Sequence, residues 1–255
     1  MRRYFNTEGQ CEPELHYMVR LDDRLREIRQ RYVERGSYFV INRGRQYGKT
    51  TTLYALAEYL KEDYITVLLD FQEISQEEFR SEDAFSTAFA EIFTRAFLEG
   101  SPQGEKILPM TAIQKNGSGI VLRELFVWLS DICGASSRPV ILLIDEVDSA
   151  TNNQVFLDFL SLLRKYYLDR KKRPTFQSVI LAGVYDIKNL KLKLRPEEES
   201  RYNTPWNIAA RFNMEMGFSA KEIAAMLQEY EADYGTGMDV DMVCGYITCS
   251  FPRKN

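Results

Sequence analysis

Hydrophobic runs alternate with amphipathic stretches along most of the chain. Runs of β-branched, aliphatic and aromatic residues predict four strands, and a weaker run predicts a fifth. These strands are expected at 37–42, 64–71, 139–148, 176–183 and, for the weaker run, 211–217. The four strong runs are almost continuously apolar, as strands are when a sheet is covered on both faces.

Amphipathic helices are predicted between the strands, because apolar residues recur there every three or four positions. The expected helical stretches are 51–60, 85–96, 121–132, 151–167 and a last one that starts at Ser219. Two of them open on a capping-box pattern, Thr151 with Gln154 and Ser219 with Glu222. Residues 100–118 are rich in glycine, proline and polar side chains, and a loop is expected there.

This alternation predicts an α/β fold of three layers, with a mostly parallel central sheet and helices on both of its faces. A chain of 255 residues suffices for one large domain with a small appendage. The expected division is an N-terminal lead-in at 1–36 that packs on the core, a core at 37–218 and the start of a helical appendage at 219–255.

Composition and charge exclude several classes of protein. The net charge of −4 provides no overall attraction to nucleic acid or anionic membranes. The apolar run at 140–144 is far shorter than the roughly 20 residues of a membrane-spanning helix, and no secretion signal opens the chain. The four cysteines form no C-x-x-C pair, so reduced thiols are expected rather than disulfides or a metal site. A cytoplasmic protein with no membrane partner is therefore expected.

The stretch "INRGRQYGKTTTL" at 41–53 follows the first strand and opens a helix, which is the context of a phosphate-binding P-loop. Gly48 would let the backbone approach the phosphates, Lys49 would reach the β- and γ-phosphates, and Thr50 would bind Mg²⁺. Arg43 stands where the P-loop pattern has its first glycine, and the next residue, Gly44, can supply part of the missing flexibility. The alternative is a basic surface turn. The predicted cofactor-binding residues are Gly44, Arg45, Gln46, Tyr47, Gly48, Lys49, Thr50 and Thr51.

A second motif, "VILLIDEVD" at 140–148, places two acids at the end of a buried strand. Asp145 is the expected Mg²⁺ ligand beside Thr50, and Glu146 is positioned to polarise the water that attacks the γ-phosphate. Taken alone, the motif also fits a strand that ends in exposed acids. Together the two motifs predict a nucleotide site in which Lys49 and Glu146 are catalytic.

Four segments, "NRGRQYGKTTTL", "LLIDEVD", "ILAGVYDIKNLK" and "YNTPWNIAARF", resemble the AAA-like ATPase domain of bacterial AAA family ATPases, relatives of the AAA+ and STAND NTPases. The first two are the general Walker A and Walker B motifs, and the last two are more particular. The resemblance implies ATP and Mg²⁺ as cofactors, a P-loop NTPase fold and the strand order 5-1-4-3-2. It also implies a γ-phosphate sensor at Tyr185 or Asp186.

Where such relatives continue into a helical lid, this chain has only "ITCSFPRKN", so the lid is expected to be truncated and turnover to be slow. Two weaker hypotheses concern single residues. Gln72, just past the second strand, could restrain Glu146, whereas the single histidine, His16, is expected to be an ordinary packing residue.

Residues 164–195 contain ten basic and two acidic side chains. This stretch could contact nucleic acid or an acidic partner, and Arg195 or Arg201 could act as an arginine finger between subunits. A solvated helix end with its loop is the simpler interpretation.

The first functional hypothesis is a Mg²⁺-dependent ATPase that couples its nucleotide state to a conformational or partner switch, through a protein partner or self-association. The alternative is a non-hydrolysing, nucleotide-gated interaction module that could contact nucleic acid through the basic stretch. Small-molecule kinase activity is disfavoured, because an Asp-Glu pair suits water activation and the sequence shows no second-substrate lid.

Overall fold

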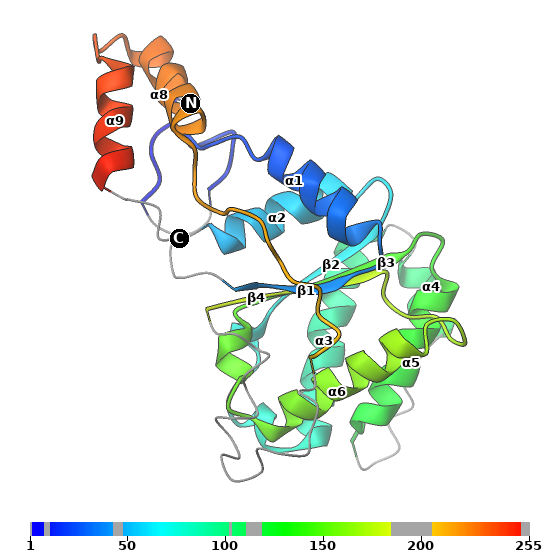
Figure 1. Ribbon diagram of the computed structural model, residues 1–255. Coiled ribbons are helices and arrows are strands. Elements are labelled where there is room, and N and C mark those ends of the chain that lie inside the picture. Colours follow the sequence, from blue (N-terminus) through cyan, green and yellow to red (C-terminus); the bar gives the residue numbers. More distant parts are fainter. Residues whose placement is uncertain are drawn as a thin grey trace.

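The computed structural model has a central sheet with helices on both faces (Figure 1). It describes residues 2–7, 11–42, 48–101, 104–110, 119–184 and 206–250. Within these ranges the strands are parallel and follow the order β1-β4-β3-β2 across the sheet. They are β1 (Tyr38–Asn42), β2 (Ile65–Asp70), β3 (Val140–Asp145) and β4 (Ser178–Gly183). The predicted α/β fold is therefore confirmed.

Helices cover both faces of the sheet, one pair on one side and a thicker layer on the other (Figure 1). The first pair is α1 (Asp22–Ile28), which continues as a π-helical turn (Arg29–Val33), and α2 (Lys49–Leu60). The opposite layer consists of α3 (Glu82–Gly100), α5 (Leu122–Ala135) and α6 (Gln154–Leu168). Short 3-10 turns follow β2 and β3 and precede α3, at Phe71–Glu73, Val147–Ala150 and Glu78–Arg80.

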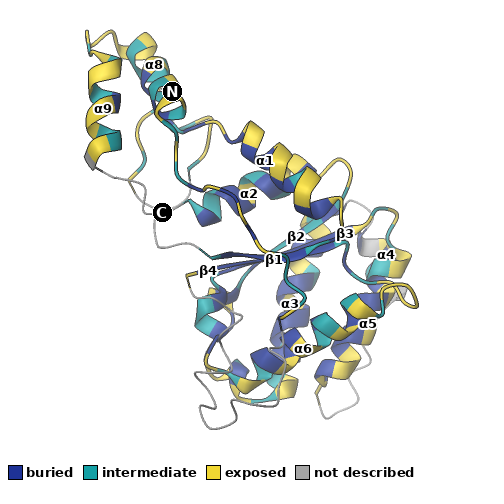
Figure 2. Ribbon diagram, in the orientation of Figure 1, coloured by how far each residue is buried: buried dark blue, intermediate teal, exposed yellow. Residues whose placement is uncertain are grey.

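The apolar pattern of the strands explains this layering, because successive side chains of a strand point to opposite faces. Phe39 and Ile141 belong to the core under α1 and α2, whereas Tyr38 and Leu142 belong to the larger core on the α3 side. The sheet is accordingly the most deeply buried part of the molecule (Figure 2).

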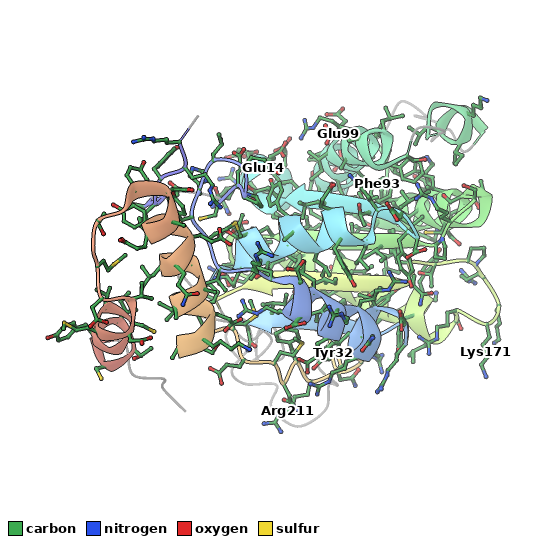
Figure 3. All side chains as sticks on the ribbon, turned by 90° about the horizontal axis from the view of Figure 1, so that it is seen from above. Glu14, Tyr32, Phe93, Glu99, Lys171 and Arg211 are labelled. Carbon is green, nitrogen blue, oxygen red and sulfur yellow. The ribbon has the colours of Figure 1, made fainter. Side chains whose placement is uncertain are left out.

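The predicted fifth strand is present only as an extended segment beside β1. Ala210 forms a single parallel bridge with Phe39, and Phe212 is buried in the core of the α1 and α2 layer. The Tyr32 hydroxyl donates to Arg211 O (3.2 Å) and accepts from Asn213 N (3.0 Å). The Tyr32 hydroxyl thus anchors this segment to the π-helical turn that precedes β1. Tyr32 and Arg211 lie on the same side of the molecule (Figure 3).

Two further local predictions were wrong. The expected loop at 100–118 contains a helix, α4 (Gly104–Met110), because Ile107 packs into the core beside α3 and α5. The expected cap of the 151–167 helix fails, since the Thr151 hydroxyl donates to Asp148 O (2.9 Å) and α6 begins only at Gln154. The other capping box is confirmed, because Ser219 accepts from Glu222 N (3.2 Å) at the start of α8.

A helical hairpin of α8 (Ala220–Tyr234) and α9 (Val240–Ser250) projects from one end of the sheet (Figure 1). The N-terminal segment is fastened to it. Arg3 forms ion pairs with Glu229 (2.6 Å) and Asp233 (3.2 Å), and the Tyr17 hydroxyl donates to Asp233 (2.6 Å). Tyr17 also contacts the ring of Tyr230 edge-on. We call this group of contacts between the lead-in and α8 the N-terminal clamp.

Candidate nucleotide-binding site

The described part of the predicted P-loop is its last residue and the helix that follows. Gly48 has φ 65° and ψ 29°, a left-handed conformation that favours glycine. An added Cβ would meet no atom of the described residues within 4 Å, so among them it is the backbone conformation that favours glycine here. Arg43 and the predicted residues Gly44, Arg45, Gln46 and Tyr47 lie outside the described residues.

The first turn of α2 is a suitable anion site on chemical grounds. Lys49 is its first residue and is only 8% exposed, although its side chain is charged. The backbone N–H of Thr52 closes the first helical hydrogen bond, to Gly48 O (2.8 Å). The N–H groups before it have no partner within the helix, and the helix dipole adds partial positive charge at this end. Thr50 and Thr51, both half-buried, belong to this turn, as predicted.

Acidic side chains stand where the middle strands end. Asp145, the last residue of β3, is 4% exposed and accepts a hydrogen bond from Glu146 N (2.9 Å). It is paired in register with Asp70, the last residue of β2. Since the carboxyl ends of parallel strands meet at one edge of the sheet, both aspartates lie on the edge to which the P-loop strand β1 also leads.

Glu146 has an unusual backbone. Its φ of 51° and ψ of 38° place it in the left-handed region, and within the described residues no other non-glycine residue has a positive φ. Such a conformation costs a glutamate roughly 1–2 kcal/mol. Ser149 holds it, because its backbone N–H and its hydroxyl both donate to Glu146 O, at 3.1 and 2.9 Å. Strained residues of this kind concentrate at functional sites.

The pKa of Glu146 shows which charged groups act on this residue. Burial raises the pKa of Glu146, and the negative charge of Asp145 raises it further. The positive charge of Lys49 opposes this shift of the Glu146 pKa, while Asp148 and Asp70 add to it more weakly. Lys49, Asp145 and Glu146 therefore belong to one electrostatic neighbourhood, in which their charges interact. Lys49 is almost a hundred residues away from the other two in the sequence.

Two residues near this edge were not predicted. Asp70 is the register partner of Asp145 on the neighbouring strand. Tyr54 lies on α2 one turn beyond Thr50. Partial burial raises the pKa of the Tyr54 phenol, and the charges of Asp70 and Asp145 raise it further, although the side chain is 43% exposed. The signals were present in the sequence, as an acid ends the second strand and Tyr54 is four residues from Thr50 on the same helical face.

The remaining candidates have simpler outcomes. The backbone N–H of Gln72 donates to Asp70 (2.8 Å), and the structure shows no contact between Gln72 and Glu146. His16 is buried, accepts from Glu12 N (2.8 Å) and packs edge-on against Tyr4, as expected of a packing residue. The sensor and arginine-finger candidates are all outside the described residues: Tyr185, Asp186, Arg195 and Arg201.

Among the described residues, no group of three or more histidine, cysteine, aspartate or glutamate side chains is arranged to hold a metal ion. No described helix has both the length and the apolar character that a membrane crossing needs. All four cysteines are free thiols, as predicted.

Comparisons with known proteins agree with this geometry. A family profile described as "AAA-like domain" matches residues 7–245. Among solved structures, a Walker-type ATPase of Pyrococcus abyssi superimposes with a TM-score of 0.60 at 15% identity, over 95% of this chain and 65% of that one. The Orc1 protein of Aeropyrum pernix, solved in complex with DNA, gives 0.47 at 11% identity, over 85% of this chain and 50% of that one. No curated protein sequence matches significantly. The chain belongs to the AAA-like domain family, and its fold is that of a P-loop ATPase.

Proposed function

We propose that this chain binds Mg²⁺-ATP and hydrolyses it, and that the nucleotide state sets a conformational or partner switch. The observation that carries the proposal is the strained Glu146 directly after buried Asp145, in one electrostatic neighbourhood with Lys49. A fold needs none of these three features for stability, since each has a cost: backbone strain, a buried carboxylate and a buried ammonium.

Each residue has a definite part in this proposal. Lys49 and the backbone N–H groups of the first turn of α2 bind the phosphates. Gly44, Arg45, Gln46 and Tyr47 complete the loop, as the family resemblance implies. Glu146 accepts a proton from the attacking water and orients it towards the γ-phosphate.

The described residues fit a magnesium ion. The Thr50 hydroxyl and the Asp145 carboxylate are hard oxygen ligands, and Mg²⁺ usually binds one or two protein oxygens and completes its shell with phosphate and water. When bound, the ion would neutralise charge on the phosphates, while the chain supplies the base and the positioning.

The test is Mg²⁺-ATP turnover of the wild-type protein beside Lys49→Ala and Glu146→Gln. We expect Lys49→Ala to lose ATP binding and Glu146→Gln to bind ATP without hydrolysing it. A wild-type protein that neither binds nor hydrolyses ATP contradicts the proposal. Turnover per molecule that rises with protein concentration supports self-association with an arginine finger supplied by a neighbouring subunit, for which Arg195 and Arg201 are the candidates.

The alternative is a nucleotide-gated interaction module that does not hydrolyse ATP. The N-terminal clamp favours it, because the lead-in is joined to α8 by partly exposed ion pairs and by ring contacts, and such ion pairs contribute little stability. In this alternative, wild-type protein binds ATP tightly and shows no turnover at any protein concentration, and ATP changes the protease sensitivity of the lead-in.

Contact with nucleic acid is a second candidate function. It would use the basic side chains of 164–173, at the end of the sheet far from the hairpin of α8 and α9. Among the described residues, no ion pair uses any of the six basic side chains of 164–173, and Lys171 lies far from α8 and α9 (Figure 3). A cavity of about 350 Å³ there is lined by Arg35 and Arg170. Binding of a labelled DNA duplex that weakens steeply with salt, and is lost in a Lys171→Ala/Lys172→Ala variant, is the expected result.

A further inference from the structure

The turn that carries Glu146 is joined to the ends of two strands. On one side, the Ser149 hydroxyl shares its single proton between Glu146 O (2.9 Å) and Phe71 O (3.3 Å), and Phe71 lies directly after β2. On the other side, the Asp148 carboxylate accepts a hydrogen bond from the backbone N–H of Val184, directly after β4. The turn therefore connects strand ends that flank β3 on both sides.

The contact with β4 is close enough to exclude a side chain. A Cβ at Gly183 would lie 2.9 Å from Val147 Cγ2 and 3.0 and 3.1 Å from the two carboxylate oxygens of Asp148. Gly183 is not among the glycines with positive φ, so it is required here for space and not for backbone conformation. The end of β4 and the side chain of Asp148 thus share one tightly packed contact.

This contact bears on Glu146 because a strained backbone persists only where its surroundings fix it. Glu146 is two residues before Asp148, and its carbonyl accepts from both donors of Ser149, the residue after Asp148. If Asp148 loses its hold on β4, the turn can rotate, and the left-handed residue is the one that gains most by relaxing.

We propose that Asp148 is a positioning residue of this site: by accepting the Val184 amide proton it holds the turn in the conformation that keeps the Glu146 carboxylate beside Asp145 and Lys49. The inference rests on the proposed ATPase function, and it adds a route from β4 to the catalytic glutamate. A shift of the chain at the end of β4 would reach Glu146 through this hydrogen bond.

Steady-state kinetics test the role in turnover. We expect Asp148→Ala to lower kcat by about 10- to 100-fold, as a misplaced catalytic group does, with KM within about twofold of wild type. Asp148→Asn retains an oxygen acceptor for Val184 and is expected to recover kcat to within about threefold. Asp158→Ala, on the exposed face of α6, is the matched control and should leave both constants unchanged. Equal losses in the Asn and Ala variants, an unchanged kcat in Asp148→Ala, or an effect on KM alone would overturn the proposal.

A second measurement does not depend on turnover. In protein without nucleotide, we expect the amides of Val184 and Ser149 to exchange hydrogen at least about tenfold faster in Asp148→Ala than in wild type, because both hydrogen bonds belong to one unit. Unchanged protection of β3 amides shows that the variant is folded. Faster exchange at Val184 with Ser149 unaffected would overturn the inference. A wild-type protein without ATPase activity that still shows the coupled exchange would instead contradict the proposed function alone.

Discussion

β2 and β3 are neighbours in the sheet, and both end in an aspartate at the same level, Asp70 beside Asp145. After β2 the chain stays extended at Asp70, with φ −109° and ψ 118°, and its carboxylate caps the following 3-10 turn by accepting from Gln72 N (2.8 Å). After β3 the chain turns sharply into the left-handed conformation of Glu146. Two strands with the same last residue therefore continue in different ways.

The difference shows that position at the sheet edge does not by itself assign a function. The Asp70 carboxylate is used by its own turn, so it stabilises local structure. Beside it, Asp145 is followed by a second acid held at a conformational cost, which a structural cap would not require. Under the proposed function, the backbone of the next residue distinguishes an acid that caps a turn from a pair that takes part in hydrolysis.

The largest expected difference is in turnover, between a variant that lacks the charge of Glu146 and one that lacks the charge of Asp70. We expect Glu146→Gln to lower ATP turnover by at least about 100-fold, because a general base is lost. Asp70→Asn keeps an oxygen that can cap the Gln72 amide, and turnover should stay within about threefold of wild type. The measurement is kcat for both variants at saturating Mg²⁺-ATP. Equal losses in the two variants would mean that both strand ends take part in the reaction.

Magnesium dependence should separate the two aspartates themselves. Asp145→Asn is expected to raise the Mg²⁺ concentration for half-maximal turnover by at least about tenfold, because a charged ligand is lost. The same curve for Asp70→Asn should overlay that of wild type. If the curves of all three proteins overlay, Asp145 is not a ligand of the Mg²⁺ ion.

Glycine substitutions test the backbone difference. Glu146→Gly should raise the free energy of unfolding by about 1 kcal/mol, because glycine adopts the left-handed conformation without strain. Asp70→Gly should lower it by roughly 0.5–1 kcal/mol, because glycine gives the unfolded chain more backbone freedom and a capping side chain is lost. Urea denaturation of both variants provides the comparison. A destabilised Glu146→Gly variant would show that the glutamate side chain contributes more to folding than its backbone costs.

The smallest expected effect concerns pH. The folded-state pKa of Glu146 is raised above its ordinary value of 4.5, so the folded protein holds this proton more tightly than the unfolded chain. Its stabilising contribution is therefore complete below pH 4.5 and is lost as the pH rises through the folded-state value. Without Mg²⁺, the stability of wild type relative to Glu146→Gln should fall over this window. A difference that does not change with pH would indicate that the carboxylate is not desolvated.

Much of this fold follows from sequence patterns, because apolar runs and helical stripes report burial directly. Four of the five predicted strands are present. Helix α4 could not be predicted, because Gly104 and Pro109 indicate a loop and the packing of Ile107 is a tertiary contact. The reduction of the fifth strand to a single bridge is likewise a tertiary feature, since its partners Phe39 and Tyr32 come from a distant part of the chain.

The residues of the site could be predicted from the sequence, but their geometry could not. Lys49, Asp145 and Glu146 were identified because their residue types stand at fixed places beside predicted strands. The sequence contains no signal for the left-handed backbone of Glu146, because glutamate is not a residue that favours this conformation. The link from Asp148 to Val184 likewise joins residues whose side chain and backbone meet only when β3 and β4 pair.

The N-terminal clamp has a consequence for the order of folding. Arg3 and Glu229 are 226 residues apart, so their ion pair closes a loop that includes nearly the whole sheet. Contacts of such sequence separation form slowly, because most of the chain must be arranged before the two ends can meet. During synthesis, the lead-in leaves the ribosome before α8 and cannot dock until α8 has emerged. Docking of the lead-in on α8 is therefore expected to be among the last steps of folding, after the nucleotide-binding edge of the sheet has formed.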